Sequence, residues 1–112
     1  MAIHELALSH YEAEKVLMPS ERGEKIVEAV RVTVFGSNFP QRAVEPELYV
    51  GKARARRVSI SRDERSLRGY FFNVPADGGA VRVSYPESQE GVLREPFARA
   101  RIRPLAKECE GR

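Results

Sequence analysis

The residues Ala29–Phe35 read AVRVTVF, and this stretch decides the fold. Val30, Val32 and Val34 alternate with other side chains, and successive side chains of an extended strand point to opposite faces. Alternation with a period of two, in a segment rich in β-branched residues, is typical of a half-buried strand. The sequence therefore predicts a β-strand whose valine face lies in the core.

This strand is expected to end directly after Phe35. Gly36, Ser37 and Asn38 are residues that favour turns, because they tolerate unusual backbone angles or bond their own backbone. Phe39 precedes Pro40 and is expected to fold back over the edge of the core.

The chain after Pro40 repeats the same pattern at short intervals. The predicted strands are Glu47–Val50, Lys52–Ser61, Ser66–Val74, Ala80–Tyr85 and Phe97–Pro104. The predicted connections are a turn at Arg62–Arg65, a turn at Pro75–Gly79 and a loop at Pro86–Gly91. The residues expected to face the core in the fourth of these strands are Val81, Val83 and Tyr85. Short strands with turns every 8 to 12 residues or so indicate a β-sandwich.

The first 28 residues fit two interpretations. Ala, Glu, Leu and Lys dominate the segment ELALSHYEAEKVLM, and this composition favours a helix. Its position before Pro19 and before the valine strand favours an edge strand that closes the sandwich. We prefer the extended first strand.

The 112 residues are expected to form one domain, because one hydrophobic core is usual at this size. The predicted fold class is all-β, an immunoglobulin-like β-sandwich of about seven strands spanning 1–112, with a frayed tail at 105–112. A cytoplasmic location without membrane insertion is expected, because the chain has neither a basic start with an apolar segment nor an apolar run of about 20 residues. A single cysteine, Cys109, agrees with a reducing compartment.

Three segments resemble IPT/TIG domains. VTVFGSNFP (Val32–Pro40) is similar to the family's strand followed by a Gly-x-Asn-Phe turn, and ELYVGK (Glu47–Lys52) to its next strand. RVSISRDERSLRGYFFNVPADGGAVRVSY (Arg57–Tyr85) resembles the later course, with a glycine-bearing hairpin and a Val-x-Val strand. The resemblance implies an immunoglobulin-like fold used in binding, and it implies no catalytic residues or cofactors.

The basic residues of the second half are the strongest candidate for a site. Residues 1–50 hold five basic and eight acidic side chains, whereas residues 51–112 hold fourteen and eight. If both segments are strands, two rows share a face each; these candidate partner-binding residues are Lys52, Arg54, Arg56, Arg99, Arg101 and Arg103. Such rows fit an acidic protein partner or a polyanion such as nucleic acid, although charged residues on strand edges also serve only to prevent aggregation.

Other chemistries have weak support in the sequence. His4 and His10 lack the further ligands of a zinc site. The acid pairs Asp63/Glu64 and Glu45/Glu47 lie in turn or strand-edge contexts, where carboxylates are usually only solvated. We therefore expect no enzyme, no metal and no cofactor. The expected function is a non-catalytic binding or assembly module that contacts another protein, with homodimer formation left open. Polyanion or nucleic-acid binding and carbohydrate binding are the alternatives.

Overall fold

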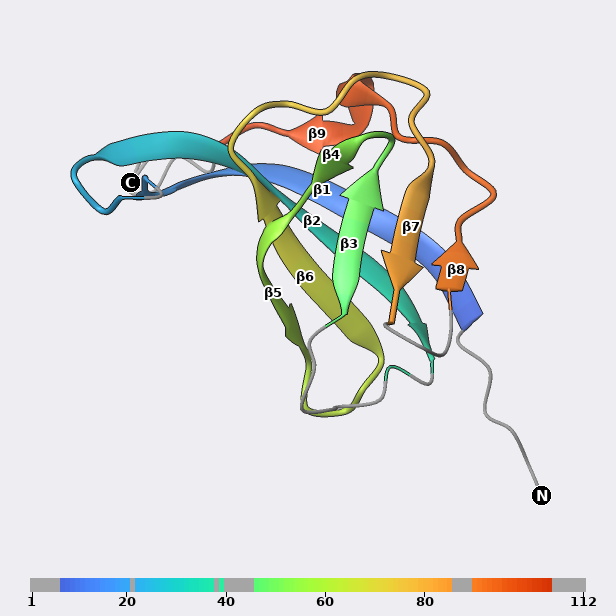
Figure 1. The fold of residues 1–112 in the computed structure, drawn as a ribbon. Coiled ribbons are helices and arrows are strands. Elements are labelled where there is room, and N and C mark those ends of the chain that lie inside the picture. Colours follow the sequence, from blue (N-terminus) through green and yellow to red (C-terminus); the bar gives the residue numbers. More distant parts are fainter. Residues whose placement is uncertain (1–6, 21, 38, 40–45, 86–89, 106–112) are drawn as a thin grey trace, which may run out of the picture.

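A computed structural model describes residues 7–20, 22–37, 39, 46–85 and 90–105. In these ranges nine strands form two open sheets packed as a sandwich, and the only helical element is one 3-10 turn. The two layers are seen in Figure 1. This confirms the predicted all-β sandwich, with more strands than the seven expected. The described residues include no helix long and apolar enough to cross a membrane.

The first sheet has five strands in the order β5-β6-β2-β1-β9. Their bounds are β1 (Ala7–Pro19), β2 (Ile26–Ser37), β5 (Arg56–Ile60), β6 (Ser66–Phe71) and β9 (Ile102–Arg103). The second sheet has the order β4-β3-β7-β8. Its strands are β3 (Glu47–Val50), β4 (Ala53–Arg54), β7 (Val81–Ser84) and β8 (Glu90–Val92), and the 3-10 turn η1 is Arg99–Arg101. Neighbouring strands are antiparallel, except that β9 runs parallel to β1.

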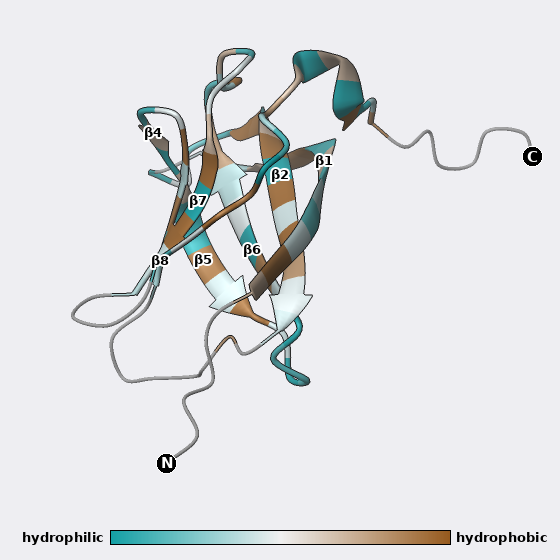
Figure 2. Cartoon of the chain, turned by 90° about the vertical axis from the view of Figure 1, so that its right-hand side faces the viewer, coloured by the Kyte–Doolittle hydropathy of each residue, from teal (hydrophilic) through white to brown (hydrophobic). Residues whose placement is uncertain are grey.

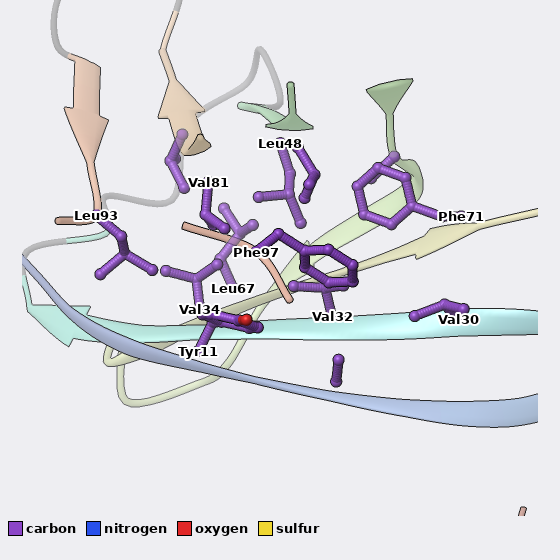
Figure 3. Close-up of a cluster of buried hydrophobic side chains, with 14 of the residues drawn as sticks. Tyr11, Val30, Val32, Val34, Leu48, Leu67, Phe71, Val81, Leu93 and Phe97 are labelled. Atoms are coloured by element: carbon purple, nitrogen blue, oxygen red, sulfur yellow. The ribbon is translucent and has the colours of Figure 1, made fainter. Parts of the chain in front are cut away.

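The core lies between the two sheets, and the valines of β2 are at its centre (Figure 3). Val34 is paired with Tyr11 of β1 and Leu67 of β6, and all three side chains are fully buried. From the second sheet the core receives the buried side chains of Leu48, Val50, Val81 and Val83. The predicted inward face of β2 is thus confirmed, and so is that of Val81, Val83 and Tyr85, all of which are buried. Figure 2 shows the matching alternation of polar and apolar bands along the strands.

The first strand is extended, as preferred over a helix. β1 pairs with β2 along almost its entire length, from Ala7 opposite Ser37 to Pro19 opposite Ile26. The predicted strand break at Gly36 is wrong, because Gly36 still pairs with Leu8. A Cβ atom at this position would lie 2.0 Å from the carbonyl oxygen of Ala7, so glycine serves here for close strand approach rather than for a turn.

After the end of β2 at Ser37, Phe39 is fully buried, which confirms that it covers the core edge. Asn38 and Pro40 lie outside the described residues.

The predicted single strand Lys52–Ser61 is wrong, because the chain changes sheets within it. Arg54 belongs to β4 of the second sheet and Arg56 to β5 of the first. Between them, the buried Ala55 donates its N–H to the carbonyl oxygen of Leu48 at 2.9 Å. Arg57 then has a φ of 53°, at an irregularity in the pairing of β5 with β6. The alternating pattern of the sequence continues through this corner, so it does not reveal where the chain changes sheets.

The predicted strand Phe97–Pro104 is also wrong, except for the two residues of β9. Phe97 is fully buried, and its backbone exchanges hydrogen bonds with Gly78 and Gly79 instead of a neighbouring strand. The chain then turns at η1, where Arg101 donates its N–H to the carbonyl oxygen of Ala98 at 3.0 Å. Ala98, Ala100 and Ile102 therefore do not form one face opposite Arg99, Arg101 and Arg103.

The predicted connections hold in part. Residues Arg62–Arg65 form a turn, and Gly78 in the turn Pro75–Gly79 has the expected positive φ of 85°. This second turn joins β6 to β7 in the other sheet, so it is not the hairpin that the family resemblance implies. Strand β6 ends at Phe71 rather than at Val74. Glu90 and Gly91 belong to β8, while the rest of the predicted loop, 86–89, lies outside the described residues.

The packing of Leu67 gives a first prediction. Its side chain is fully buried between the sheets, so Leu67→Ala should lower the free energy of unfolding by about 2–5 kcal/mol, because lost apolar contacts and a residual cavity both destabilise the core. Chemical denaturation measures the change. Val92→Ala, at an exposed position, should change stability by less than about 0.5 kcal/mol. Equal effects of the two substitutions would contradict this core.

Candidate interaction surface

The six predicted basic residues do not form one surface. Arg54 lies at an edge of the second sheet, and Arg56 and Arg103 lie in strands at opposite edges of the first. Lys52 is exposed in the turn between β3 and β4. Because the two segments are not neighbouring strands, they do not build the continuous positive ladder that adjacent rows would give.

Most of these cations already bind partners within the chain. Arg54 pairs with Glu47 at 3.1 Å, Arg101 with Glu95, and Arg103 with Glu12 at 3.3 Å. The Nε atom of Arg99 donates to the carbonyl oxygen of Pro75 at 3.0 Å, and its backbone N–H donates to the Asp77 carboxylate at 2.6 Å. The guanidinium of Arg101 also lies 5.0 Å from the ring centre of Tyr11. These arginines hold the loops and the late part of the chain in place.

One residue from each strand of the first sheet joins a single row across its outer face. The row follows the pairing register and consists of Arg103, Glu14, Arg31, Tyr70 and Arg56. Glu14 is central, since it pairs with Arg31 and lies 3.7 Å from Arg103. The hydrogen bond that Arg31 donates to Glu14 raises the pKa of Arg31, against the opposing effect of partial burial, and Tyr70 adds to the rise. Glu14 thus interacts with two of the three arginines in this row, and Arg103 also pairs with Glu12.

The hairpin formed by β1 and β2 extends past the rest of the sandwich, as Figure 1 shows at the left. Within the described part of the chain, no strand pairs with β2 before Val30 or with β1 after Glu14. We call the free portion, Lys15–Pro19 with Ile26–Ala29, the β-arm. Its outer edges carry backbone groups without a strand partner, which is the condition under which another strand can be added.

The β-arm exposes large apolar side chains. Leu17 is 59% exposed and Ile26 is 63% exposed. Both lie on the face that continues the core side of the hairpin, but here the second sheet no longer covers them. The only described ion pair on this face of the arm joins Lys15 to Glu28 at 4.0 Å. Burial of exposed apolar side chains such as these contributes binding energy when a partner covers them.

Two hollows flank the open β2 edge of the β-arm. One of about 310 Å³ lies toward the hairpin turn and is lined by Val27, Glu28 and Phe72, together with polar turn residues. The other, of about 270 Å³, lies at the base of the arm, where β6 has ended, and its lining includes Glu28, Phe72 and Val74. Val74 is 42% exposed. Both hollows thus border Glu28 of the β2 edge, and the basal one is lined by the polar residues Lys15 and Asn73 as well as by apolar side chains.

Sequence reasoning did not single out Leu17, Ile26 or Val74. Their exposure depends on how far the hairpin extends beyond the ends of β6 and β9. The local sequence pattern does not show where these neighbouring strands end. The available signal was indirect: alternation before Pro19 and in Ile26–Ala29 is weaker than in Ala29–Phe35, as expected for a ribbon with water on more than one side.

The remaining candidates show no convergent chemistry. Among the residues that the structure describes, no group of three or more His, Cys, Asp or Glu side chains could hold a metal ion. His10 stacks on Phe35 with ring centres 4.6 Å apart, and Glu47 accepts a hydrogen bond from the Tyr49 hydroxyl. His4, Glu45 and Cys109 lie outside the described ranges.

The acid pair Asp63/Glu64 belongs to the turn between β5 and β6. The Asp63 carboxylate accepts the Ser61 hydroxyl at 2.6 Å and the backbone N–H of Arg65 at 3.1 Å. Asp63 therefore fixes the turn through local hydrogen bonds.

Comparisons with protein-family models, with curated proteins and with solved structures found no match for this chain. The structure itself shows a two-sheet, all-β sandwich.

The turn at Asp63 gives a second prediction. The Ser61 hydroxyl, followed by the Arg65 N–H, lowers the pKa of Asp63 below that of an ordinary aspartate. Any stabilisation from this carboxylate is present above the ordinary pKa and is lost as the pH falls through the lowered one. In an NMR titration, Ser61→Ala should raise the pKa of Asp63, whereas Ser59→Ala should leave it unchanged. An unshifted pKa in Ser61→Ala would exclude this hydrogen bond as the main cause.

Proposed function

We propose that the chain is a non-catalytic binding or assembly module that contacts another protein, and that the β-arm is its contact surface. The observation that carries the proposal is the exposure of Leu17 and Ile26 on a ribbon with open edges. Exposed apolar groups beside unpaired strand edges favour association with another polypeptide, because both the apolar area and the backbone groups are then satisfied.

We extend the proposal to an immunoglobulin-like domain of the IPT/TIG kind. The sequence similarity around Val32–Pro40 and the two-sheet architecture support it, although the family's hairpin at Pro75–Gly79 is replaced by a crossing between sheets. Domains of that family are used in binding, which agrees with a role for the β-arm and with the absence of implied catalytic residues.

The described ion pairs weigh against the alternatives. Polyanion binding needs cations that are available to phosphates or sulfates, and four of the six candidate residues, Arg54, Arg99, Arg101 and Arg103, already bind acids or carbonyl oxygens. Carbohydrate binding favours open aromatic faces, whereas the Tyr49 ring is covered by the Arg82 guanidinium at 4.5 Å. Protein binding through the β-arm requires neither feature.

Capture experiments test the proposed surface. The immobilised chain should retain one or more proteins from its native extract, and Leu17→Asp should lose them, because a charge replaces an apolar contact at the centre of the arm. Val92→Asp is the matched control, since Val92 is 55% exposed on the other sheet. Retention of the same proteins by the Leu17→Asp variant would contradict a role for the arm.

Heparin chromatography tests the polyanion alternative. We expect Lys52→Ser/Arg56→Ser to elute at nearly the same salt concentration as the unchanged chain. If these substitutions abolished a salt-sensitive retention, the arginine rows rather than the β-arm would be the binding surface.

A further inference from the structure

The outer face of the first sheet carries an exposed cation that has no partner within the chain. Arg68 lies in β6 between two buried residues, so the alternation of side chains directs it to the outer face, where it is exposed. Among the residues that the structure describes, none forms an ion pair or a side-chain hydrogen bond with Arg68. Glu12 and Glu14 of β1 already pair with other arginines. The Arg68 guanidinium is thus available to an anion from outside the chain.

Hydroxyl side chains flank Arg68 in all four directions on this face. The pairing register places Thr33 of β2 and Ser59 of β5 opposite it. Ser66 and Tyr70 lie two residues before and after it on β6, and therefore on the same face. None of these four neighbours is an acid. A guanidinium among hydroxyl groups supplies a positive charge together with further hydrogen-bond donors, and phosphate oxygens accept both kinds of hydrogen bond.

Two stacked rings lie beside this group on the same face. Phe35 pairs in register with Ser66 on one side and with His10 on the other. The ring centres of His10 and Phe35 are 4.6 Å apart and the ring planes differ by 12°. His10 is exposed, and the Ser9 hydroxyl is 2.9 Å from its Nδ1 atom. We call the two rings the aromatic platform; one ring rests on the other, and the outer ring is open to a ligand.

The aromatic platform lies close to cations. Phe35 is the diagonal neighbour of Arg68 across the β2–β6 pair, and diagonal neighbours in a sheet are about 7–8 Å apart. A hollow of about 440 Å³ opens beside the platform, and its lining includes His10, Phe35 and Arg65. Flat aromatic groups beside arginines are the arrangement by which proteins hold unpaired bases and their phosphates. An acidic peptide would pair with the arginines but would leave the platform unused.

We propose that the outer face around Arg68 binds an unpaired nucleotide of a single-stranded nucleic acid, with the base stacked on the aromatic platform and a neighbouring phosphate on the Arg68 guanidinium. The site lies on the face of the sheet and away from the free edges of the β-arm, so it is independent of the proposed protein contact. It also requires none of the six basic residues that the sequence singled out. Four of those already bind acids or carbonyl oxygens, whereas Arg68 does not.

Fluorescence anisotropy with a labelled oligothymidine of about ten nucleotides tests the phosphate contact. Arg68→Ser should weaken binding by about tenfold, because a charge-assisted contact to phosphate is lost. It should also reduce the slope of log Kd against log salt by about 0.7, the contribution of one phosphate on a single strand. Arg94→Ser removes the same charge from an exposed position after β8 and should change binding less than about twofold. Equal weakening by the two substitutions, or no binding by the unchanged chain, would overturn the proposal.

Removal of the rings tests the stacking contact. The double variant His10→Ser/Phe35→Leu keeps an apolar side chain at the half-buried position in β2 and should weaken oligothymidine binding by about fivefold or more, because base stacking is lost. Its salt slope should stay that of the unchanged chain, since no phosphate contact is removed. Tyr49→Leu, on the second sheet, should bind like the unchanged chain, and circular dichroism checks that all variants are folded. Full affinity without the two rings would contradict the stacked base.

Competition experiments distinguish the sources of this chemistry. Unlabelled oligothymidine should displace the probe at a much lower concentration than thymidine monophosphate, because a single strand also places neighbouring phosphates along the face. If the mononucleotide competes equally well, the same site takes a free nucleotide and the single strand is wrong as its ligand. Heparin carries charge without bases; if it competes as well as oligothymidine, and loss of the rings changes nothing, the face is only a polyanion surface and the proposal fails.

Discussion

The pairing of β1 with β2 is the interaction on which the rest of the structure depends. This hairpin supplies the two longest strands, and the other three strands of its sheet are added to its edges. Its inner face carries Tyr11, Val32 and Val34, against which the second sheet packs. The same hairpin then runs past β6 and β9, so one element both forms the floor of the core and leaves the sandwich as the β-arm.

Charged side chains on the outer face of this sheet contact one another. Glu14 holds Arg31 and approaches Arg103, and Tyr70 and Arg56 continue the row to the far edge. Several arginines thus bind acids or carbonyl groups that the fold brings next to them, among them Arg31, Arg54 and Arg82. Partly exposed pairs of this kind contribute little stability individually, but they keep a broad sheet face polar and discourage unspecific pairing.

Local alternation was sufficient to predict the strands at Val30, Leu48 and Val81, because one buried face requires a period of two. It was insufficient where distant groups decide the backbone. Ala55 marks a change of sheet that depends on a hydrogen bond to Leu48, and Phe97 leaves the strand path because Gly78 and Gly79 offer it backbone partners. The candidate surface was missed for the same reason: the exposure of Ile26 is decided by where the neighbouring strands end.

The parallel contact between β1 and β9 has a consequence for synthesis on the ribosome. Tyr11 accepts the backbone N–H of Ala98 at 2.9 Å, so one of the first core residues to be made is satisfied by one of the last. Until that late segment leaves the exit tunnel, a nascent chain cannot cover Tyr11 with Phe97 or extend its sheet with β9. Completion of the fold therefore waits until the residues near Ala98 have been made, and it is expected to be slow relative to folds built from local contacts.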